Sequence, residues 1–209
     1  MLISIIRDIG KIKTRDFKGK LTIGIIGTHL GAGSTHFAIL LSNYLSECLG
    51  MKTAYIECFP QKELIYMEEI YDLCGKATST RDYFSLYKVR YYKSIREEKI
   101  PKIMSEGFDC LVLDLGVDIN KMKNEFLRCD KRIVISNLAP WKSNKVEEFL
   151  AKTGFKGAEE NLEFGISFTT DRFLKDSSRH FKIPFFSIPY EPDPFALSNN
   201  TIKMIQKII

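Results

Sequence analysis

The chain alternates short apolar runs with segments whose apolar residues recur at helical spacing. Continuous apolar runs predict buried strands at 21–27, 52–57, 108–115, 131–137, 162–168 and 184–188. Apolar spacings of three and four residues, with glycine and proline at the ends, predict helices at 35–49, 62–74, 96–106, 143–152 and 196–209. This alternation predicts a doubly wound, three-layer α/β fold, in which a mostly parallel sheet carries helices on both faces.

The length and composition predict a single domain with two basic additions. The 209 residues are 44% apolar, enough for one sizeable core, and the net charge is +5. Residues 1–20 carry six Lys/Arg against two Asp, and residues 76–102 carry eight against three acidic residues. We therefore expect a basic N-terminal segment at 1–20 and one domain at 21–209, with a basic aromatic insert at about 76–102.

Both basic segments have a structural and a binding interpretation. Within the insert, 83–93 is rich in Tyr and β-branched residues, which predicts an edge strand or hairpin whose lysines protect the sheet edge. Nucleic-acid binding is the less favoured alternative, because the rest of the domain is mildly acidic. In the N-terminal segment, one helical face gathers Leu2, Ile5, Ile9 and Ile12. That face fits an anionic membrane surface or packing on the domain.

The cysteines point to a reducing compartment. Their number is odd, none forms a C-x-x-C pair, and most lie among apolar residues: Cys48, Cys58, Cys74, Cys110 and Cys129. The N-terminal apolar run is too short for a signal peptide. The expected location is the cytoplasm.

A glycine-rich turn between the first strand and the first helix, residues 27–36, carries the most chemistry. Glycines there let backbone N–H groups approach an anion, and the helix N-terminus adds a favourable dipole. In a purely structural interpretation, Gly31 and Gly33 only permit a tight turn between the strand and the helix. As a phosphate cradle, the turn fits a P-loop, with Thr35 as the Mg²⁺-binding hydroxyl and Asp114 as the carboxylate on a neighbouring strand.

A dinucleotide site is the second interpretation of the turn. Gly27, Gly31 and Gly33 match the G-x-x-x-G-x-G turn of short-chain dehydrogenases, and Glu57 would then hold a ribose hydroxyl. The Tyr-x-x-x-Lys pair that such oxidoreductases need does not occur among the nine tyrosines. This argues against the oxidoreductase chemistry, although a bare dinucleotide site stays open.

Five segments in order and spacing resemble the MinD/ParA-like deviant P-loop ATPases of the SIMIBI class, which include pilus-positioning proteins of the TadZ/CpaE type. The segments are the turn at 29–35, the end of the second strand at 57–61, the strand at 109–116, the strand 133–137 with its following Pro140, and the proline loop at 188–193. The resemblance covers about residues 21–195 and implies a P-loop NTPase-like fold.

The resemblance also implies a set of site residues for ATP or ADP with Mg²⁺. Nucleotide contacts would come from His29, Gly31, Ala32, Gly33, Ser34, Thr35, His36, Pro189 and Glu191. The metal ion would lie near Thr35, Glu57 and Asp114. No other metal is expected, because the remaining histidines and cysteines lack ligand spacing. Trp141 is expected to plug the core or an interface.

Three departures from the family pattern fall on residues that carry chemistry. His29 stands at the signature lysine that reaches across a dimer, Ser34 at the phosphate-binding lysine, and Phe59 at the aspartate that orients water. Because phosphoryl transfer depends on positioning and charge neutralisation, these losses predict little hydrolysis. His29, His36, a lysine of the insert or a second subunit could supply the missing charge.

The combined expectation is a degenerate member of this family. It would bind ATP or ADP weakly or not at all, and act as a spatial-organisation or assembly accessory through protein partners, for example in pilus or surface machinery. A homodimer is implied by the family and made doubtful by His29. The alternatives are an active Mg²⁺-dependent ATPase and a dinucleotide-binding oxidoreductase-like domain.

Overall fold

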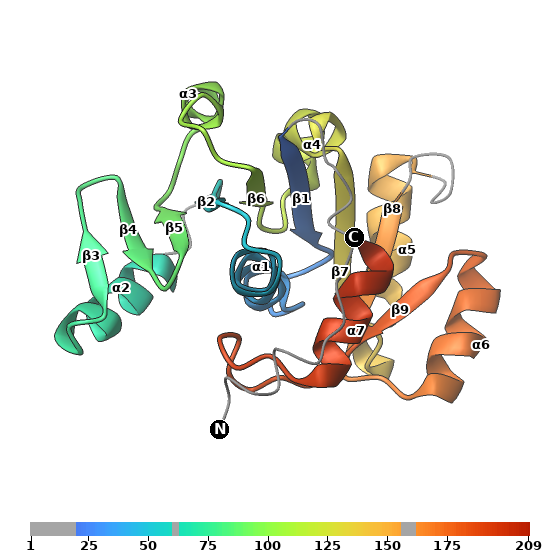
Figure 1. The fold of residues 1–209 in the computed structure, drawn as a ribbon. Helices are drawn as coiled ribbons and strands as arrows, with labels where there is room; N and C mark the ends of the chain where they lie inside the picture. The colour runs from blue at the N-terminus through green and yellow to red at the C-terminus, as the bar shows by residue number, and fades with distance from the viewer. Residues whose placement is uncertain (1–19, 60–62, 156–161) are drawn as a thin grey trace.

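The computed structural model describes residues 20–59, 63–155 and 162–209, whose strands form one nine-stranded sheet (Figure 1). The strand order is β3-β4-β5-β2-β6-β1-β7-β8-β9. The strands are β1 (Leu21–Gly27), β2 (Thr53–Glu57), β3 (Ala77–Ser79), β4 (Tyr83–Leu86), β5 (Val89–Tyr92), β6 (Cys110–Asp114), β7 (Lys131–Asn137), β8 (Leu162–Ser167) and β9 (Phe185–Ile188). All neighbours pair in parallel except β3–β4 and β4–β5.

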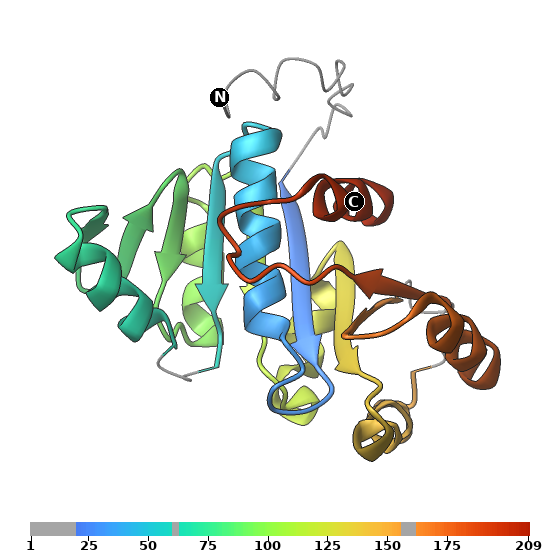
Figure 2. The same cartoon turned by 90° about the horizontal axis from the view of Figure 1, so that it is seen from below.

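Helices cover both faces of this sheet, which confirms the predicted three-layer α/β fold (Figures 1 and 2). One face carries α1 (Ser34–Asn43), which continues as a π-helical turn (Tyr44–Cys48), together with α2 (Glu63–Leu73) and α7 (Asn199–Ile208). The other face carries α3 (Ile100–Met104), α4 (Ile119–Arg128), α5 (Asn144–Thr153) and α6 (Asp171–Phe181). Short 3-10 turns precede α3 (Glu97–Lys99) and α5 (Pro140–Lys142).

Successive residues of the central strands enter opposite cores. In β1, Ile23 and Ile25 pack towards α1 and α7, whereas Ile26 packs towards α4. In β6, Val112 and Leu113 divide in the same way. Because both faces are buried, these strands are mostly apolar, and this is why the sequence predicts them so clearly.

The elements that were not predicted from the sequence are two helices and one strand: α4, α6 and β3. The last helix was predicted but differs in detail. The predicted helix at 196–209 begins only at Asn199, and Ser198 caps it by accepting a hydrogen bond from the Thr201 amide. Its inward face holds the buried Ile205 and Ile208, and Ile202 and Ile209 are partly buried against the same core. The cap at Ser198 fixes this helical phase.

The basic insert is an integral part of the sheet. The predicted hairpin at 83–93 exists as β4 and β5, but β5 pairs in parallel with β2, and β3 forms the edge instead. Phe84, Tyr91 and Tyr92 are buried. The hairpin was predicted at the edge of the sheet, and this position was wrong. Its buried aromatic side chains belong to β4 and β5, which lie inside the sheet, and β3 is the edge strand.

Several other predictions concern surfaces and buried thiols. Trp141 is 79% exposed, so it does not plug the core of this chain. All five cysteines are free thiols, and Cys58, Cys110 and Cys129 are buried. Across the described ranges, no helix has the length and apolarity needed to cross a bilayer. The predicted amphipathic face at 2–12 and the segment 60–61 lie outside the described residues.

Candidate functional site: the P-loop edge of the sheet

The predicted site residues gather at the edge where the parallel strands end. Thr28–Gly33 leaves the carboxyl end of β1 and enters α1 in the middle of this edge (Figure 2). In open α/β sheets, ligands bind outside the carboxyl ends of the strands. The segment is called the P-loop from here on.

The P-loop has a backbone geometry that suits an anion. Gly31 and Gly33 have φ of 78° and 96°, in the left-handed region that favours glycine. Helix α1 begins directly after Gly33, with no side-chain cap and no acidic residue in its first turn. No carboxylate of the helix's own first turn therefore competes for its N-terminal amides and the positive end of its dipole.

Hydrogen bonds hold the start of the P-loop against both neighbouring strands. The Gly27 amide donates to the Gly116 carbonyl at 2.8 Å, and the Thr28 amide donates to the Ile135 carbonyl at 2.9 Å. The hydroxyl of Thr28 lies 2.8 Å from that of Ser136. The loop is thus fixed to β6 on one side and to β7 on the other.

Ser34 occupies the first turn of α1 with a buried hydroxyl. A Cβ atom added at Gly27 would lie 3.2 Å from Ser34 Oγ and 3.3 Å from Ala32 Cβ, so the turn packs closely on β1. The position expected to carry an ammonium group therefore holds a short neutral side chain. The backbone of the cradle is present without that charge.

Asp114 is the centre of a buried hydrogen-bond cluster beside the P-loop. Its Oδ2 accepts from the Thr35 hydroxyl at 2.6 Å and from the Tyr55 hydroxyl at 2.7 Å, and its Oδ1 accepts from the Gly116 amide at 3.2 Å. Burial raises the pKa of Asp114, and these hydrogen bonds oppose the rise. Burial and the neighbouring carboxylate raise the pKa of Tyr55 well above its usual value, so Tyr55 stays a donor.

Glu57 stands next to this cluster, because β2 pairs with β6 in the register Glu57↔Asp114. Its Oε2 accepts from the amide and the hydroxyl of Ser94, both at 2.9 Å. Ser94 has φ of 49°, which turns the chain after β5 towards this carboxylate. Burial raises the pKa of Glu57, although the hydrogen bonds from Ser94 lower it.

These oxygens fit a magnesium ion better than they fit a softer metal. Mg²⁺ takes oxygen ligands, and P-loop proteins hold it with a threonine or serine hydroxyl and a strand-end aspartate. Thr35 and Asp114 already touch, and Glu57 lies in register beside them. No group of three His, Cys, Asp or Glu side chains suited to another metal occurs within the described ranges.

His29 lies on the P-loop beside the end of β7, with its Nδ1 2.9 Å from the Thr28 hydroxyl. Burial lowers the pKa of His29, and the ammonium groups of Lys142 and Lys145 lower it further. Only the Glu148 carboxylate acts in the opposite direction. The imidazole is therefore predominantly neutral at pH 7 and does not by itself replace a lysine.

The proline loop, in which Pro189 and Glu191 were predicted to contact the nucleotide, has a structural role at the start of α7. Glu191 Oε2 accepts from the Ser198 amide at 2.9 Å and from the Thr201 hydroxyl at 2.7 Å. Burial raises the pKa of Glu191, but these hydrogen bonds, with a contribution from His36, leave it below its usual value. Glu191 thus orders the proline loop, and its neighbour Pro189 is half-buried.

Two exposed aromatic side chains, one in this loop and one after β8, were not singled out as site residues from the sequence. Phe168 follows β8 and is 73% exposed, and Tyr190 follows β9 and is 74% exposed. Their ring centroids are 6.0 Å apart. Ser167, which ends β8, lies near the P-loop, because a Cβ at Gly33 would be 3.5 Å from its hydroxyl.

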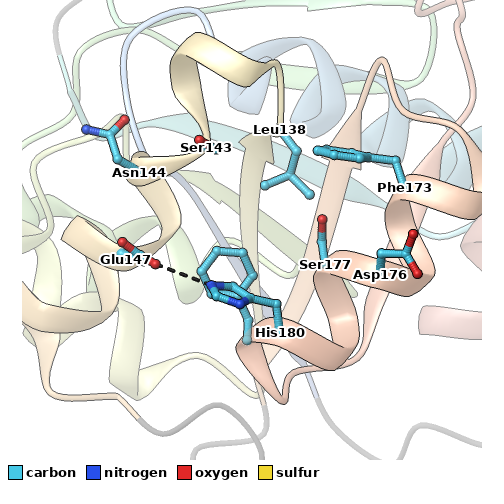
Figure 3. Close-up of a pocket in the computed structure, with 9 residues that line it drawn as sticks. Leu138, Ser143, Asn144, Glu147, Phe173, Asp176, Ser177 and His180 are labelled. Atoms are coloured by element: carbon cyan, nitrogen blue, oxygen red, sulfur yellow. Dashed lines mark hydrogen bonds and ion pairs between the residues drawn. The ribbon is translucent and has the colours of Figure 1, made fainter.

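The hollow of about 350 Å³ shown in Figure 3 lies elsewhere, between α5 and α6. Leu138, Phe173 and Phe181 give it an apolar lining, and His180 Nε2 lies 3.5 Å from Glu147 Oε1 at one side. None of its lining residues belongs to the P-loop or to the predicted nucleotide and metal contacts. The predicted site is therefore separate from this hollow.

Neither family models nor curated protein sequences give a match to this chain, but solved structures do. A plasmid partition protein from Borrelia burgdorferi B31, bound to AMPPNP, is similar with a TM-score of 0.63 and 19% identity, over 91% of this chain and 97% of that one. Cobyrinic acid a,c-diamide synthase from Mycobacterium smegmatis, with ADP and magnesium, has a TM-score of 0.61 and 11% identity, over 90% and 91% of the two chains.

The cell division protein MinD from Aquifex aeolicus is also similar, with a TM-score of 0.57 and 18% identity, over 82% of this chain and 83% of that one. These identities are too low to carry over an activity, but the coverage extends over most of each chain. The chain therefore has the fold of the MinD/ParA-type P-loop ATPases.

Proposed function

We propose that this protein binds ATP or ADP with Mg²⁺ weakly at the P-loop, turns it over inefficiently at most, and acts through protein partners. The observation that carries the proposal is the direct contact between Thr35 and Asp114 beside a P-loop that has Ser34 in place of a lysine. The metal side of a nucleotide site is built, whereas its main phosphate charge is missing. Such a site suits binding better than hydrolysis.

The retained parts match what a Mg²⁺–nucleotide needs. The left-handed Gly31 and Gly33 and the uncapped start of α1 offer backbone N–H groups to phosphates. Thr35, with Glu57 and Asp114, would hold the metal ion, which when bound neutralises phosphate charge. Among the structurally similar proteins, one is bound to AMPPNP and another to ADP and magnesium.

The departures from the family pattern argue against efficient hydrolysis. A charge-assisted hydrogen bond contributes about 1.5–3 kcal/mol, or about 10–150-fold in affinity, and Ser34 cannot supply one from an ammonium group. His29 is predominantly neutral, and half-buried Phe59 offers no carboxylate to orient a water. We therefore assign no catalytic residue.

Exposed apolar side chains at the same edge support a role in protein binding. Leu30, Trp141, Phe168 and Tyr190 are each at least 69% exposed and follow β1, β7, β8 and β9, which are neighbours in the sheet. Exposed apolar side chains gathered on one surface mark interaction sites. The neighbour MinD of Aquifex aeolicus occurs in a complex with MinC. We infer a spatial-organisation or assembly accessory in the cytoplasm, with a second copy of the chain as one further partner.

Calorimetric titration with Mg²⁺-ATP and Mg²⁺-ADP tests the nucleotide part of the proposal. We expect dissociation constants in or above the micromolar range for the wild type, and no binding for Gly33→Arg, whose side chain would fill the cradle at a left-handed position. Gly75→Arg is the matched control, because Gly75 is also left-handed (φ 65°) but is exposed after α2, away from the P-loop.

Two results would overturn this proposal. Silence of the wild type with both nucleotides would remove nucleotide binding and leave only the partner role. Turnover of Mg²⁺-ATP on the order of 1 per second, within the ordinary range of enzymes, would show an active ATPase. Equal loss of binding in G33R and G75R would mean that the substitution acts through folding, which circular dichroism checks.

A further inference from the structure

The P-loop lacks an ammonium group of its own, so any cation near it comes from another element. Two lysines of the insert are engaged elsewhere, because Lys88 pairs with Glu47 at 3.0 Å and Lys93 pairs with Glu68 at 2.7 Å. Both ion pairs tie the insert to neighbouring helical segments. The turn after β7 is different, since β7 is the direct neighbour of β1.

The end of β7 is fixed beside the P-loop by a chain of hydrogen bonds. Gly27 is in register with Ile135, and Thr28 binds both Ile135 and Ser136. Directly after β7, the Ala139 amide donates to Asn137 Oδ1 at 2.7 Å, and the Lys142 amide donates to the Ala139 carbonyl at 2.7 Å. These bonds set the 3-10 turn Pro140–Lys142 at the same edge as the P-loop.

Two cations of this region act on the P-loop electrostatically. The ammonium groups of Lys142 and Lys145 disfavour the protonated form of His29, so their field reaches the loop. The same field would attract an anion held there. Among the groups that act on the pKa of His29, Glu148 is the acid that opposes the two lysines.

The two lysines are not equivalent. Lys145 is paired with Glu148 at 2.7 Å, so much of its charge is neutralised. Lys142 is half-buried and forms no ion pair with any residue in the described ranges. The ammonium group of Lys142 is therefore available to bind an anionic ligand. The neighbouring His29 is predominantly neutral and does not pair with that ammonium group.

We propose that Lys142 supplies, from the turn after β7, the positive charge for the phosphate groups of the bound nucleotide that Ser34 cannot supply. This inference rests on the proposed nucleotide site, and it names a phosphate-binding residue in a part of the chain outside the P-loop. Lys145 strengthens the local field, and Glu148 limits it. The site is a phosphate cradle whose backbone and cation come from two neighbouring strands.

The test compares Lys142→Gln with the conservative Lys142→Arg and with Lys207→Gln, which changes an exposed lysine in the last turn of α7. Each variant is titrated with Mg²⁺-ATP, Mg²⁺-ADP and inorganic tripolyphosphate. We expect K142Q to bind each about tenfold more weakly than the wild type, K142R to bind within about threefold, and K207Q to be unchanged. The salt dependence of binding should also be shallower in K142Q.

The outcomes separate this inference from the function on which it rests. A wild type that binds none of the three ligands overturns the proposed nucleotide site. A wild type that binds, together with a K142Q variant of equal affinity and equal salt dependence, overturns the role of Lys142 alone. Loss for the nucleotides without loss for tripolyphosphate would contradict a phosphate contact. Thermal unfolding of each variant checks that the fold is kept. We expect no loss of fold, because Lys142 is only half-buried.

Discussion

The two sides of the P-loop differ in how far the protein has arranged them in advance. On the acidic side, which comprises Thr35, Tyr55, Glu57 and Asp114, the functional groups are buried or half-buried. Hydrogen bonds of 2.6–2.7 Å join Thr35 and Tyr55 to Asp114, and Ser94 holds Glu57. On the aromatic side, which comprises Phe168, Pro189 and Tyr190, both rings are more than 70% exposed. One side keeps its geometry through internal bonds, and the other presents apolar surface to solvent.

This difference shows which parts of the site serve the fold. Asp114 would satisfy Tyr55 and Gly116 even if no metal ion ever bound, so its presence alone does not show activity. The exposed rings of Phe168 and Tyr190 contribute little to the core, so the stability of the fold does not explain why they are present. Function is therefore tested better on the aromatic side, and stability is tested better on the acidic side.

The largest expected effect comes from removing the centre of the acidic side. Asp114→Ala leaves the fully buried Tyr55 hydroxyl and the Thr35 hydroxyl without their acceptor, and we expect a loss of about 3 kcal/mol in the free energy of unfolding. Urea denaturation measures it. Asp72→Ala, at an exposed position on α2, should change stability by less than about 0.5 kcal/mol. An equally small effect at Asp114 would show that the acidic side is not a structural cluster.

A smaller effect of opposite sign is expected on the aromatic side. Phe168 has φ of 54°, which costs a non-glycine residue about 1 kcal/mol, so Phe168→Gly should raise the free energy of unfolding by about that amount. The same change removes the ring opposite Tyr190 and should weaken nucleotide binding several-fold.

Tyr190→Ala is the matched variant, because it removes the partner ring without relieving strain. We expect it to weaken binding to a similar degree with no gain in stability. If F168G binds nucleotide as tightly as the wild type, the aromatic side has no part in the nucleotide site, and its rings serve a protein partner alone.

The smallest expected effect is a pH dependence on the acidic side. Burial raises the pKa of Glu57 in the folded protein, so the folded state binds this proton more tightly than the unfolded state. The stability from this group is complete below its unfolded pKa and is lost as the pH rises through the folded pKa. Glu57→Gln cannot ionise, and its amide oxygen can still accept from Ser94.

We therefore expect E57Q to gain stability over the wild type between pH 4 and pH 8, as measured by urea unfolding at several pH values. Glu98→Gln, at an exposed position, controls for the change in net charge. A constant difference between E57Q and the wild type across this range would show that the ionisation of Glu57 costs the fold nothing.

The sequence predicts the sheet well and the surroundings of the site less well. The strands β1, β6 and β7 have mainly apolar centres, because both of their faces are buried there. In helix α6 only Ser177 is buried, so no run of buried apolar residues marks this helix in the sequence. Helix α4 did offer a signal, since Ile119, Met122 and Phe126 are buried at helical spacing, and our prediction overlooked it.

The candidate site shows the same division between local and tertiary information. Glycine spacing and a strand-end carboxylate identify the P-loop and Asp114 from the sequence. Tyr55 reads as one more apolar strand residue, and only the pairing of β2 with β6 brings its hydroxyl to Asp114. Lys142 gives no local signal either, because its relation to the P-loop depends on the pairing of β1 with β7.

The strand order also has a consequence for how the chain folds as it leaves the ribosome. Strand β1 is made first, but its two neighbours are β6, which begins at residue 110, and β7, which begins at residue 131. At a synthesis rate of about 5–20 residues per second, roughly 4–17 s pass between the synthesis of Leu21–Gly27 and that of β6, its first sheet partner. During synthesis this segment is an exposed aggregation-prone strand, and chaperones that bind nascent chains are expected to hold it until β6 emerges.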